Sequence, residues 1–322
     1  MNLEGKKVLV LGGAGFIGSH VVSELLKTNV NQVVIFDNFS RGKYVNVEQS
    51  LHDKRCFIYP KGGDIRDIDI LNDAMSDIDI VIHLAAMWLL HCKDFPRTAF
   101  KVNIEGTFNV LEACVKNNIQ RLIYSSSASV YGDAIELPMS ENHPFNNRNF
   151  YGATKISGEA MCRAYYDRYG LDYVGLRYMN VYGPKQDQNA IYTGVIPILI
   201  NKIDSNEIPI LNGDGSQAYD FINVTDAARC NIKAIETSVV DQFYNVGTGV
   251  QTSISELCNL ILDLKKSSLE VVYKPYSESD NRQLVKNRIA CIKKAKSDLG
   301  FEYKIGLIQG IKQLIDWRLK NK

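Results

Sequence analysis

The sequence predicts an α/β protein in which a doubly wound parallel sheet carries a smaller α+β C-terminal lobe. Short β-rich runs alternate with longer helical patterns through the first half, which implies a parallel sheet with helices on both faces. The β-rich runs are apolar without strict alternation, as is typical of strands buried on both sides. A chain of 322 residues, 45% of them hydrophobic, is long enough for two lobes and a large core.

The expected elements follow one another along the first half. Strands are short runs rich in Val, Ile and aromatic residues, at residues 7–11, 32–36, 56–59, 80–83, 121–125 and 173–177. Helical patterns lie between them, at residues 16–27, 68–75, 96–117 and 150–169.

The alternation loosens after residue 180. We expect loops around Pro184, Pro197 and Pro209 and a glycine-rich turn, then one more strand of the first sheet at 243–247. Residues 252–265 and 305–319 predict helices of the second lobe. The expected division is a first domain of residues 1–180 plus about 220–250, and a second lobe of residues 181–219 and 251–322.

The composition excludes several classes of partner. The net charge is +1 with Lys and Arg spread along the chain, so neither nucleic acid nor an anionic membrane is an expected partner. The longest apolar stretch, residues 80–90, is shorter than the ~18 residues of a membrane span. Seven cysteines without a CxxC pair indicate free thiols in a reducing cytoplasm, and five scattered histidines predict no metal site.

Three glycines follow the first strand and open the first helix. Gly12 permits a tight turn, Gly15 lets the backbone approach a pyrophosphate, and Gly18 lets helix and strand pack closely. The free N–H groups at the helix start, around Phe16 and Ile17, then face the phosphates. The pattern therefore predicts a Rossmann-type, dinucleotide-binding domain.

Asp37, at the end of the second strand, supports this prediction. A carboxylate there accepts hydrogen bonds from the adenosine ribose and repels a 2′-phosphate, so we expect NAD rather than NADP, although Arg41 nearby weakens that preference. The competing interpretation of Asp37 is a solvated turn residue. Asp64 and Ile65, after the third strand, could contact adenine, with a helix N-cap as the rival role for Asp64.

Tyr151 and Lys155 are four residues apart and share one face of a predicted helix. A free tyrosine has a pKa of ~10 and is a poor base at neutral pH. A lysine ammonium about 4 Å away would lower that pKa by roughly 3, to near 7. The pair therefore predicts a general base.

Serines 125, 126 and 127 end the preceding strand. One of these hydroxyls could hydrogen-bond the reacting oxygen beside Tyr151, and Ser127 is the expected one. Capping of the strand end by serines is the competing interpretation, and we favour it for Ser125 and Ser126.

With these motifs, nearly the whole chain resembles the extended short-chain dehydrogenase/reductases, specifically the NAD-dependent epimerase/dehydratase family that includes UDP-glucose 4-epimerase. Further markers lie at residues 83–86, 103–107, 125–132, 176–184 and 213–220. The resemblance implies Tyr151 as the base, Lys155 as its partner and Ser127 as the hydroxyl that shares the substrate oxygen. It implies cofactor contacts from Asn38, Leu84, Ala85, Ala86, Asn103 and Tyr178, and substrate contacts from Asn180 and Trp88.

Several residues depart from the family pattern. Dehydratases of the family carry Asp-Glu where this chain has Ala128 and Ser129, which argues against dehydration. Tyr219 replaces an arginine that often binds a phosphate, so Arg282 or Arg288 could serve instead. Trp88 and His91 are expected on a loop that faces the sugar, with plain packing as the alternative for Trp88.

The expected activity is NAD-dependent oxidation of a nucleotide sugar, UDP- or GDP-linked, at C4, with the second lobe binding the nucleotide sugar. A 4-epimerase is favoured. The alternatives are a net C4 dehydrogenase that makes a 4-keto sugar, possibly from a GDP-sugar or GDP-heptose, for surface-polysaccharide biosynthesis, a net reductase, or a non-catalytic NAD-binding module. The resemblance also implies a homodimer or higher oligomer formed through the helices near 96–117 and 150–169.

Overall fold

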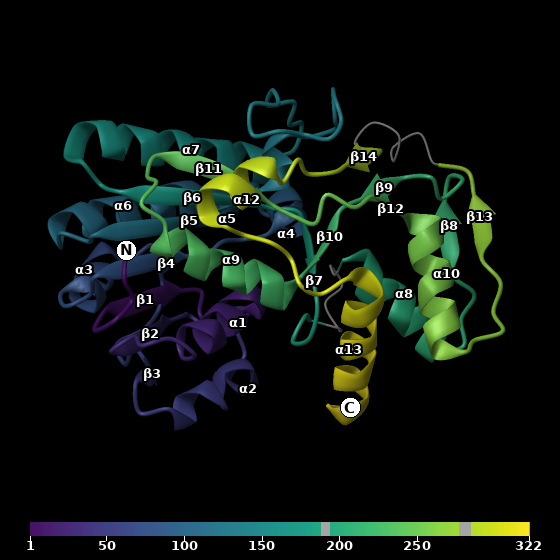
Figure 1. Ribbon diagram of the computed structural model, residues 1–322, viewed down its shortest axis with the longest axis horizontal. Helices are drawn as coiled ribbons and strands as arrows, with labels where there is room; N and C mark the ends of the chain where they lie inside the picture. Colours follow the sequence, from purple (N-terminus) through teal and green to yellow (C-terminus); the bar gives the residue numbers. More distant parts are fainter. Residues whose placement is uncertain (188–193, 277–284, 322) are drawn as a thin grey trace.

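The computed structural model describes residues 1–187, 194–276 and 285–321. Its main sheet has seven parallel strands in the order β11-β6-β5-β4-β1-β2-β3 (Figure 1). These strands are β1 (Lys7–Leu11), β2 (Gln32–Phe36), β3 (Cys56–Ile58), β4 (Ile80–His83), β5 (Arg121–Ser127), β6 (Tyr173–Tyr178) and β11 (Gln242–Val246). The strand order reverses between β1 and β4, which is where ligands bind in open α/β sheets.

Alternate residues of each strand face opposite sides of the sheet, and both sides are buried. Val8 and Val10 belong to one core, whereas Leu9 and Leu11 belong to the other. The first core is covered by α1 (Phe16–Leu25), α9 (Val224–Glu236) and α12 (Lys293–Leu299), and the second by α3 (Ile68–Met75), α6 (Gly106–Lys116) and α7 (Phe150–Tyr169) (Figure 1). The predicted doubly wound fold is therefore confirmed.

The second lobe has its own core. It contains α8 (Val195–Asp204), α10 (Ile254–Lys265) and α13 (Leu307–Lys320), with the strand pair β8 (Ile210–Asn212) and β13 (Val272–Lys274) (Figure 1). Two small sheets join it to the first domain: β7 (Asn180–Tyr182) with β10 (Phe221–Asn223), and β9 (Ala218–Tyr219) with β12 (Thr252–Ser253) and β14 (Asn287–Arg288).

Three helices in the second half were not expected. The predicted loop at Pro197 is wrong: this residue lies in the first turn of α8, where its missing N–H has no helical partner to lose. Helices α9 and α12 were also missed, and α9 restores the strand–helix–strand alternation before β11. Because α12 packs on α9 and β11, part of the 251–322 segment covers the first domain.

The expected long helix at 96–117 has three parts. It begins as α5 (Pro96–Ala99), passes through a π-helical turn (Phe100–Glu105) and continues as α6. Short helices α2 (Tyr44–Val47) and α4 (Leu89–Asp94) lie in the loops after β2 and β4. Within the described residues, none of the helices combines the length and apolarity that a membrane span requires.

Candidate active site

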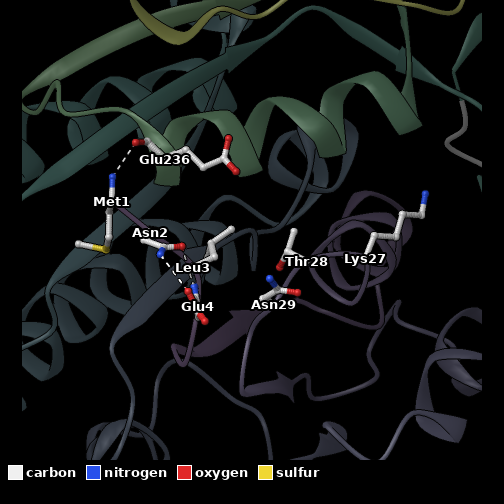
Figure 2. A pocket seen from close by; sticks show the side chains of 8 residues that line it. All are labelled: Met1, Asn2, Leu3, Glu4, Lys27, Thr28, Asn29 and Glu236. Atoms are coloured by element: carbon white, nitrogen blue, oxygen red, sulfur yellow. Dashed lines mark hydrogen bonds between the residues drawn. The ribbon is translucent and has the colours of Figure 1, made fainter.

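The predicted site residues gather at the carboxyl ends of β1, β2, β4 and β5. A recess at the opposite end of β1 is lined instead by the first four residues, the turn after α1 and Glu236 (Figure 2). There the terminal amine of Met1 donates to the carbonyl of Glu236 at 2.6 Å. None of the predicted catalytic or cofactor residues borders this recess, so the candidate active site is the strand-end face.

The three glycines of the first loop have different surroundings. Gly12 has φ +82°, and a Cβ there would lie 2.8 Å from the backbone nitrogen of Ala85 in the loop after β4. A Cβ on Gly18 would lie 2.1 Å from the carbonyl oxygen of Gly12, so α1 packs directly on the loop. A Cβ on Gly15 would meet only the Gly12 oxygen at 3.1 Å, and α1 starts without a side-chain cap. The open space at Gly15 and the uncapped first turn of α1 fit a pyrophosphate.

The carboxylate of Asp37 holds the same loop. It accepts hydrogen bonds from the backbone N–H of Ala14 at 2.9 Å and of Phe39 at 2.8 Å. Burial raises the pKa of Asp37, while these backbone donors oppose the rise. A carboxylate has about four acceptor positions, so two such bonds leave capacity for ribose hydroxyls. This arrangement fits NAD.

Asn38 and Asp64 meet beside this loop, as expected of an adenine-side pair. Their side chains hydrogen-bond each other, and Asp64 also forms an ion pair with Arg66 at 2.5 Å. The N-cap of α3 is Asp67, so the capping alternative for Asp64 is wrong. Ile65 is buried against α6, where a Cβ on Gly106 would touch it.

The loop after β4 carries Leu84, Ala85 and Ala86, all half-buried, beside Gly12. Asn103 holds the next residue of this loop: its amide accepts from the N–H of Met87 at 2.7 Å and donates to the Met87 carbonyl at 2.8 Å. The same amide donates to Thr154 on α7 at 3.1 Å. The polar groups of Asn103 therefore position the loop against α7.

Tyr151, Lys155 and Ser127 lie together, on α7 and at the end of β5. The Lys155 ammonium lies 5.7 Å from the centroid of the Tyr151 ring and donates to the carbonyl of Ser125 at 2.7 Å. The Ser127 hydroxyl hydrogen-bonds the Tyr151 side chain and accepts from the backbone N–H of Ser129 at 3.1 Å. Ser127 thus combines the two roles considered for the serines, because it also caps a short helical turn.

Without a cofactor, the expected lowering of the Tyr151 pKa by Lys155 is wrong. Burial raises the pKa of Tyr151 to about 12, Cys92 adds to the rise, and the Ser127 hydrogen bond opposes it. Burial lowers the pKa of Lys155 to about 8, against the influence of Cys92 and Glu159. The expectation failed because burial dominates the pKa of Tyr151, and the Lys155 ammonium donates to the Ser125 carbonyl.

A buried ion pair joins α7 to β6, and the sequence analysis missed it. Arg177 on β6 donates to both carboxylate oxygens of Glu159, at 2.7 and 2.9 Å, and neither side chain is more than 3% exposed. The Ser126 hydroxyl donates to the same carboxylate at 2.5 Å. The signal in the sequence was spacing: Glu159 follows Lys155 by four residues on one helical face.

Tyr178, expected beside the cofactor, has its hydroxyl engaged by the protein. It donates to the side-chain oxygen of Asn231 on α9 at 2.9 Å. This bond joins the end of β6 to α9.

On the side of the second lobe, Asn180 opens β7 and donates to the carbonyl of Asp220 at 3.1 Å. The hydroxyl of Tyr219 donates to the carbonyl of Val285 at 2.7 Å. Tyr219 is therefore tied to the neighbouring segment and provides no cation for a phosphate.

Arg288 lies directly opposite Tyr219 in the β9–β14 pair. Its Nη2 donates to the carbonyl of Gly132 at 3.3 Å, and its Nε is buried without a hydrogen-bond partner among the described residues. A cation placed here could replace the charge missing at Tyr219. Arg282, the other candidate, lies outside the described residues.

Trp88 lies between the cofactor side and α4. The guanidinium of Arg41 is 4.9 Å from the centroid of its ring, and the His91 ring packs on it edge-on at 6.3 Å. The loop predicted for Trp88 and His91 is only partly correct, because His91 belongs to α4. The Arg41 contact supports the packing interpretation of Trp88.

Comparisons with known proteins identify the family of this chain. Residues 8–247 match the model of the NAD dependent epimerase/dehydratase family. A putative UDP-glucose 4-epimerase of Methanocaldococcus jannaschii is 37% identical over 317 residues, which cover 98% of this chain and 99% of that protein.

Two solved structures extend the similarity to three dimensions. UDP-N-acetylglucosamine 4-epimerase from Methanobrevibacter ruminantium, in complex with UDP-N-acetylmuramic acid, has a TM-score of 0.91 and 34% identity, over 99% of this chain and 100% of that one. UDP-glucose 4-epimerase from Thermus thermophilus, in complex with NAD, has a TM-score of 0.84 and 29% identity, over 97% of this chain and 99% of that one.

Proposed function

The chain belongs to the NAD-dependent epimerase/dehydratase family, and from that premise we propose that it is a nucleotide-sugar 4-epimerase. The observation that carries this proposal is the grouping of Tyr151, Ser127 and Lys155 at the strand ends, beside a loop that fits the pyrophosphate of NAD. NAD, when bound, supplies the hydride acceptor and a positive charge beside Tyr151.

The residues of the chain divide the work at the C4 hydroxyl. Ser127 already accepts a hydrogen bond from Ser129, so its own proton is available to bond the substrate oxygen. Tyr151 takes the hydroxyl proton during oxidation and returns it during reduction. Lys155, held by the carbonyl of Ser125, keeps a positive charge near the phenol below its pKa of about 8.

Dehydration is not supported by the same strand end. Ala128 and Ser129, at the positions where dehydratases carry their acids, are buried in the turn after β5. Neither side chain can protonate a departing C6 hydroxyl at neutral pH. The 4-keto sugar therefore has one productive fate in this proposal, which is rotation and reduction on its other face.

The test uses UDP-glucose and UDP-N-acetylglucosamine carrying deuterium at C4, incubated with the NAD-loaded protein and followed by NMR. An epimerase gives the C4 epimer with its deuterium retained and no accumulated NADH. A 4-keto sugar formed with equimolar reduced cofactor would establish a net dehydrogenase instead. Tyr151→Phe should lower turnover about 10³-fold while NAD stays bound.

For the substrate itself, we propose a UDP-linked sugar whose diphosphate contacts Arg288 and Asn180 in the second lobe. The buried Nε of Arg288, which has no hydrogen-bond partner among the described residues, supports the diphosphate contact. The UDP-sugar bound to the Methanobrevibacter ruminantium epimerase supports the choice of base. A GDP-linked panel tested in parallel gives the contrary outcome: turnover of a GDP-sugar alone would overturn the choice of base.

We also propose that two copies associate through α6 and α7. Phe108 and Tyr169 on these helices are 45% and 54% exposed, and Phe100 in the π-helical turn before α6 is 51% exposed; aromatic side chains are enriched at protein interfaces. Phe108→Glu should convert the dimer to a monomer in sedimentation equilibrium. Ile308→Glu, at an exposed position on α13, is the control and should leave the dimer intact.

A further inference from the structure

Two segments far apart in the sequence meet beside the dinucleotide loop. The first, residues 41–46, follows Asp37, and the second, residues 184–187, follows β7. The ammonium of Lys185 donates to the carbonyl of Asn46 at 2.6 Å. The carboxylate of Asp187 lies 3.2 Å from the ammonium of Lys43 and 4.0 Å from the guanidinium of Arg41.

The first segment is in turn attached to the glycine loop. The carbonyl of Ala14 accepts from the Asn46 side chain at 2.9 Å and from the backbone N–H of Lys43 at 3.1 Å. Gly42 packs on the carboxylate of Asp37, because a Cβ there would lie 2.7 Å from its Oδ1. The residues that face the ribose and phosphates of NAD are therefore tied, through Asn46, to residues 184–187.

A third contact attaches the second segment to α1. The ring of His20 hydrogen-bonds the carbonyl of Pro184 at 3.0 Å, one turn into the helix whose first residues face the phosphates. Residues 184–187 therefore contact residues 41–46 through Lys185 and Asp187, and contact α1 through the carbonyl of Pro184.

We propose that residues 184–187 form a retaining strap that holds NAD in the protein between turnovers. The strap keeps residues 41–46 against the adenosine end of the site, so the cofactor leaves only when the Lys185 and Asp187 contacts open. This inference rests on the proposed function, since an epimerase returns its hydride to the sugar and has no need to exchange NAD, whereas a net dehydrogenase must exchange it at each turnover.

The two contacts of the strap differ in solvent exposure, so they should differ in their sensitivity to salt. Lys185 is half-buried, and burial lowers the pKa of its ammonium. Lys43 and Arg41 are exposed, so salt should screen their attraction to Asp187. Opening of the strap should therefore depend in part on ionic strength.

The experiment measures how fast bound NAD leaves the purified, NAD-loaded protein when it is chased with the fluorescent analogue etheno-NAD, with no sugar present. Lys185→Met should speed release about tenfold, because it removes a hydrogen bond from a charged donor. Asp187→Asn should speed release about threefold. High salt should speed release from the unaltered protein and have a smaller effect on Asp187→Asn.

Asp214→Asn is the matched control, since this exposed aspartate accepts hydrogen bonds from Ser216 in its own turn, far in sequence from residues 184–187. Unchanged release rates in both strap variants, with unfolding temperatures also unchanged, would overturn the strap. Because the readout contains no sugar, it separates the two proposals: fast release from the variants without epimerisation by the unaltered protein would sustain the strap and refute the 4-epimerase.

Discussion

The cofactor half and the substrate half of this site are built differently. On the cofactor side, the important positions are fixed by the backbone: Gly12 and Gly18 have no room for a Cβ, and Asp37 bonds main-chain N–H groups. On the proposed substrate side, Tyr219 and Arg288 are brought opposite each other by the pairing of β9 with β14. Backbone constraints leave a local pattern in the sequence, whereas a side-chain contact between distant strands does not.

The largest effect should come from the buried pair between α7 and β6, which is a side-chain contact near the proposed cofactor side. Arg177→Met should lower the free energy of unfolding by about 3–5 kcal/mol, because it leaves the Glu159 carboxylate buried without its partner. Urea denaturation measures the change. The exposed pair of Asp64 and Arg66 is the control, and Arg66→Met should cost less than about 1 kcal/mol. Equal losses would contradict the role of burial.

A second test changes a position that is fixed by the backbone in the cofactor half. Gly18→Ala should abolish NAD binding and cost about 3 kcal/mol of stability, because its Cβ would lie 2.1 Å from the carbonyl of Gly12. Calorimetric NAD titration and thermal unfolding report the two effects. Gly306→Ala, where a Cβ would meet nothing within 4 Å, should change stability by less than about 1 kcal/mol. If Gly18→Ala bound NAD normally, the backbone argument would fail.

A third test strikes the side chains of the substrate half. Arg288→Gln should raise the substrate KM about 10- to 100-fold, the equivalent of ~1.5–3 kcal/mol for hydrogen bonds to a charged group, with a smaller change in kcat. Adding Tyr219→Arg in the same chain should recover most of the affinity, because the two positions face each other. An unchanged KM in the single variant would show that the diphosphate lies elsewhere.

The smallest effect is the pH dependence of stability that comes from His20, which contacts Pro184. Burial lowers the pKa of His20 to about 4, whereas an unfolded histidine titrates near 6.5. Between about pH 6.5 and 4, His20 is protonated in the unfolded chain but neutral in the folded chain. The free energy of unfolding therefore falls as pH decreases over this range. His20→Gln should reduce this loss by roughly 1–2 kcal/mol in urea unfolding at pH 5 and 7. His83, whose pKa burial lowers to about 3, contributes to the slope in the same direction.

The fold could be predicted wherever one segment carries its own signal. The expected bounds of β1, β2, β4, α3 and α7 agree with the structure, because their apolar runs are bounded by turns or by caps such as Asp67 and Asn149. Helix α8 was missed because Pro197 was interpreted as a loop residue, although proline is tolerated in the first turn of a helix.

The sequence predicted which residues lie together in the candidate site better than it predicted their contacts. The sequence placed Tyr151, Lys155 and Ser127 in one group, yet it could not show that Lys155 bonds the Ser125 carbonyl. The π-helical turn at Phe100–Glu105 carries Asn103 to the backbone of Met87, and no pattern of apolar residues announces such a turn. These details depend on packing between segments that are distant in sequence.

The late position of α12 has a consequence for the order of assembly during synthesis. Ala295, Leu299 and Phe301 complete the core between α1, α9 and the sheet, so the part of that face under α12 stays uncovered until these late residues have left the ribosome. The last strand, β11, arrives only at residues 242–246. Although its nucleotide motif is made first, this domain can finish folding only after most of the second lobe has been translated, and a nascent chain must shield its apolar surface until then.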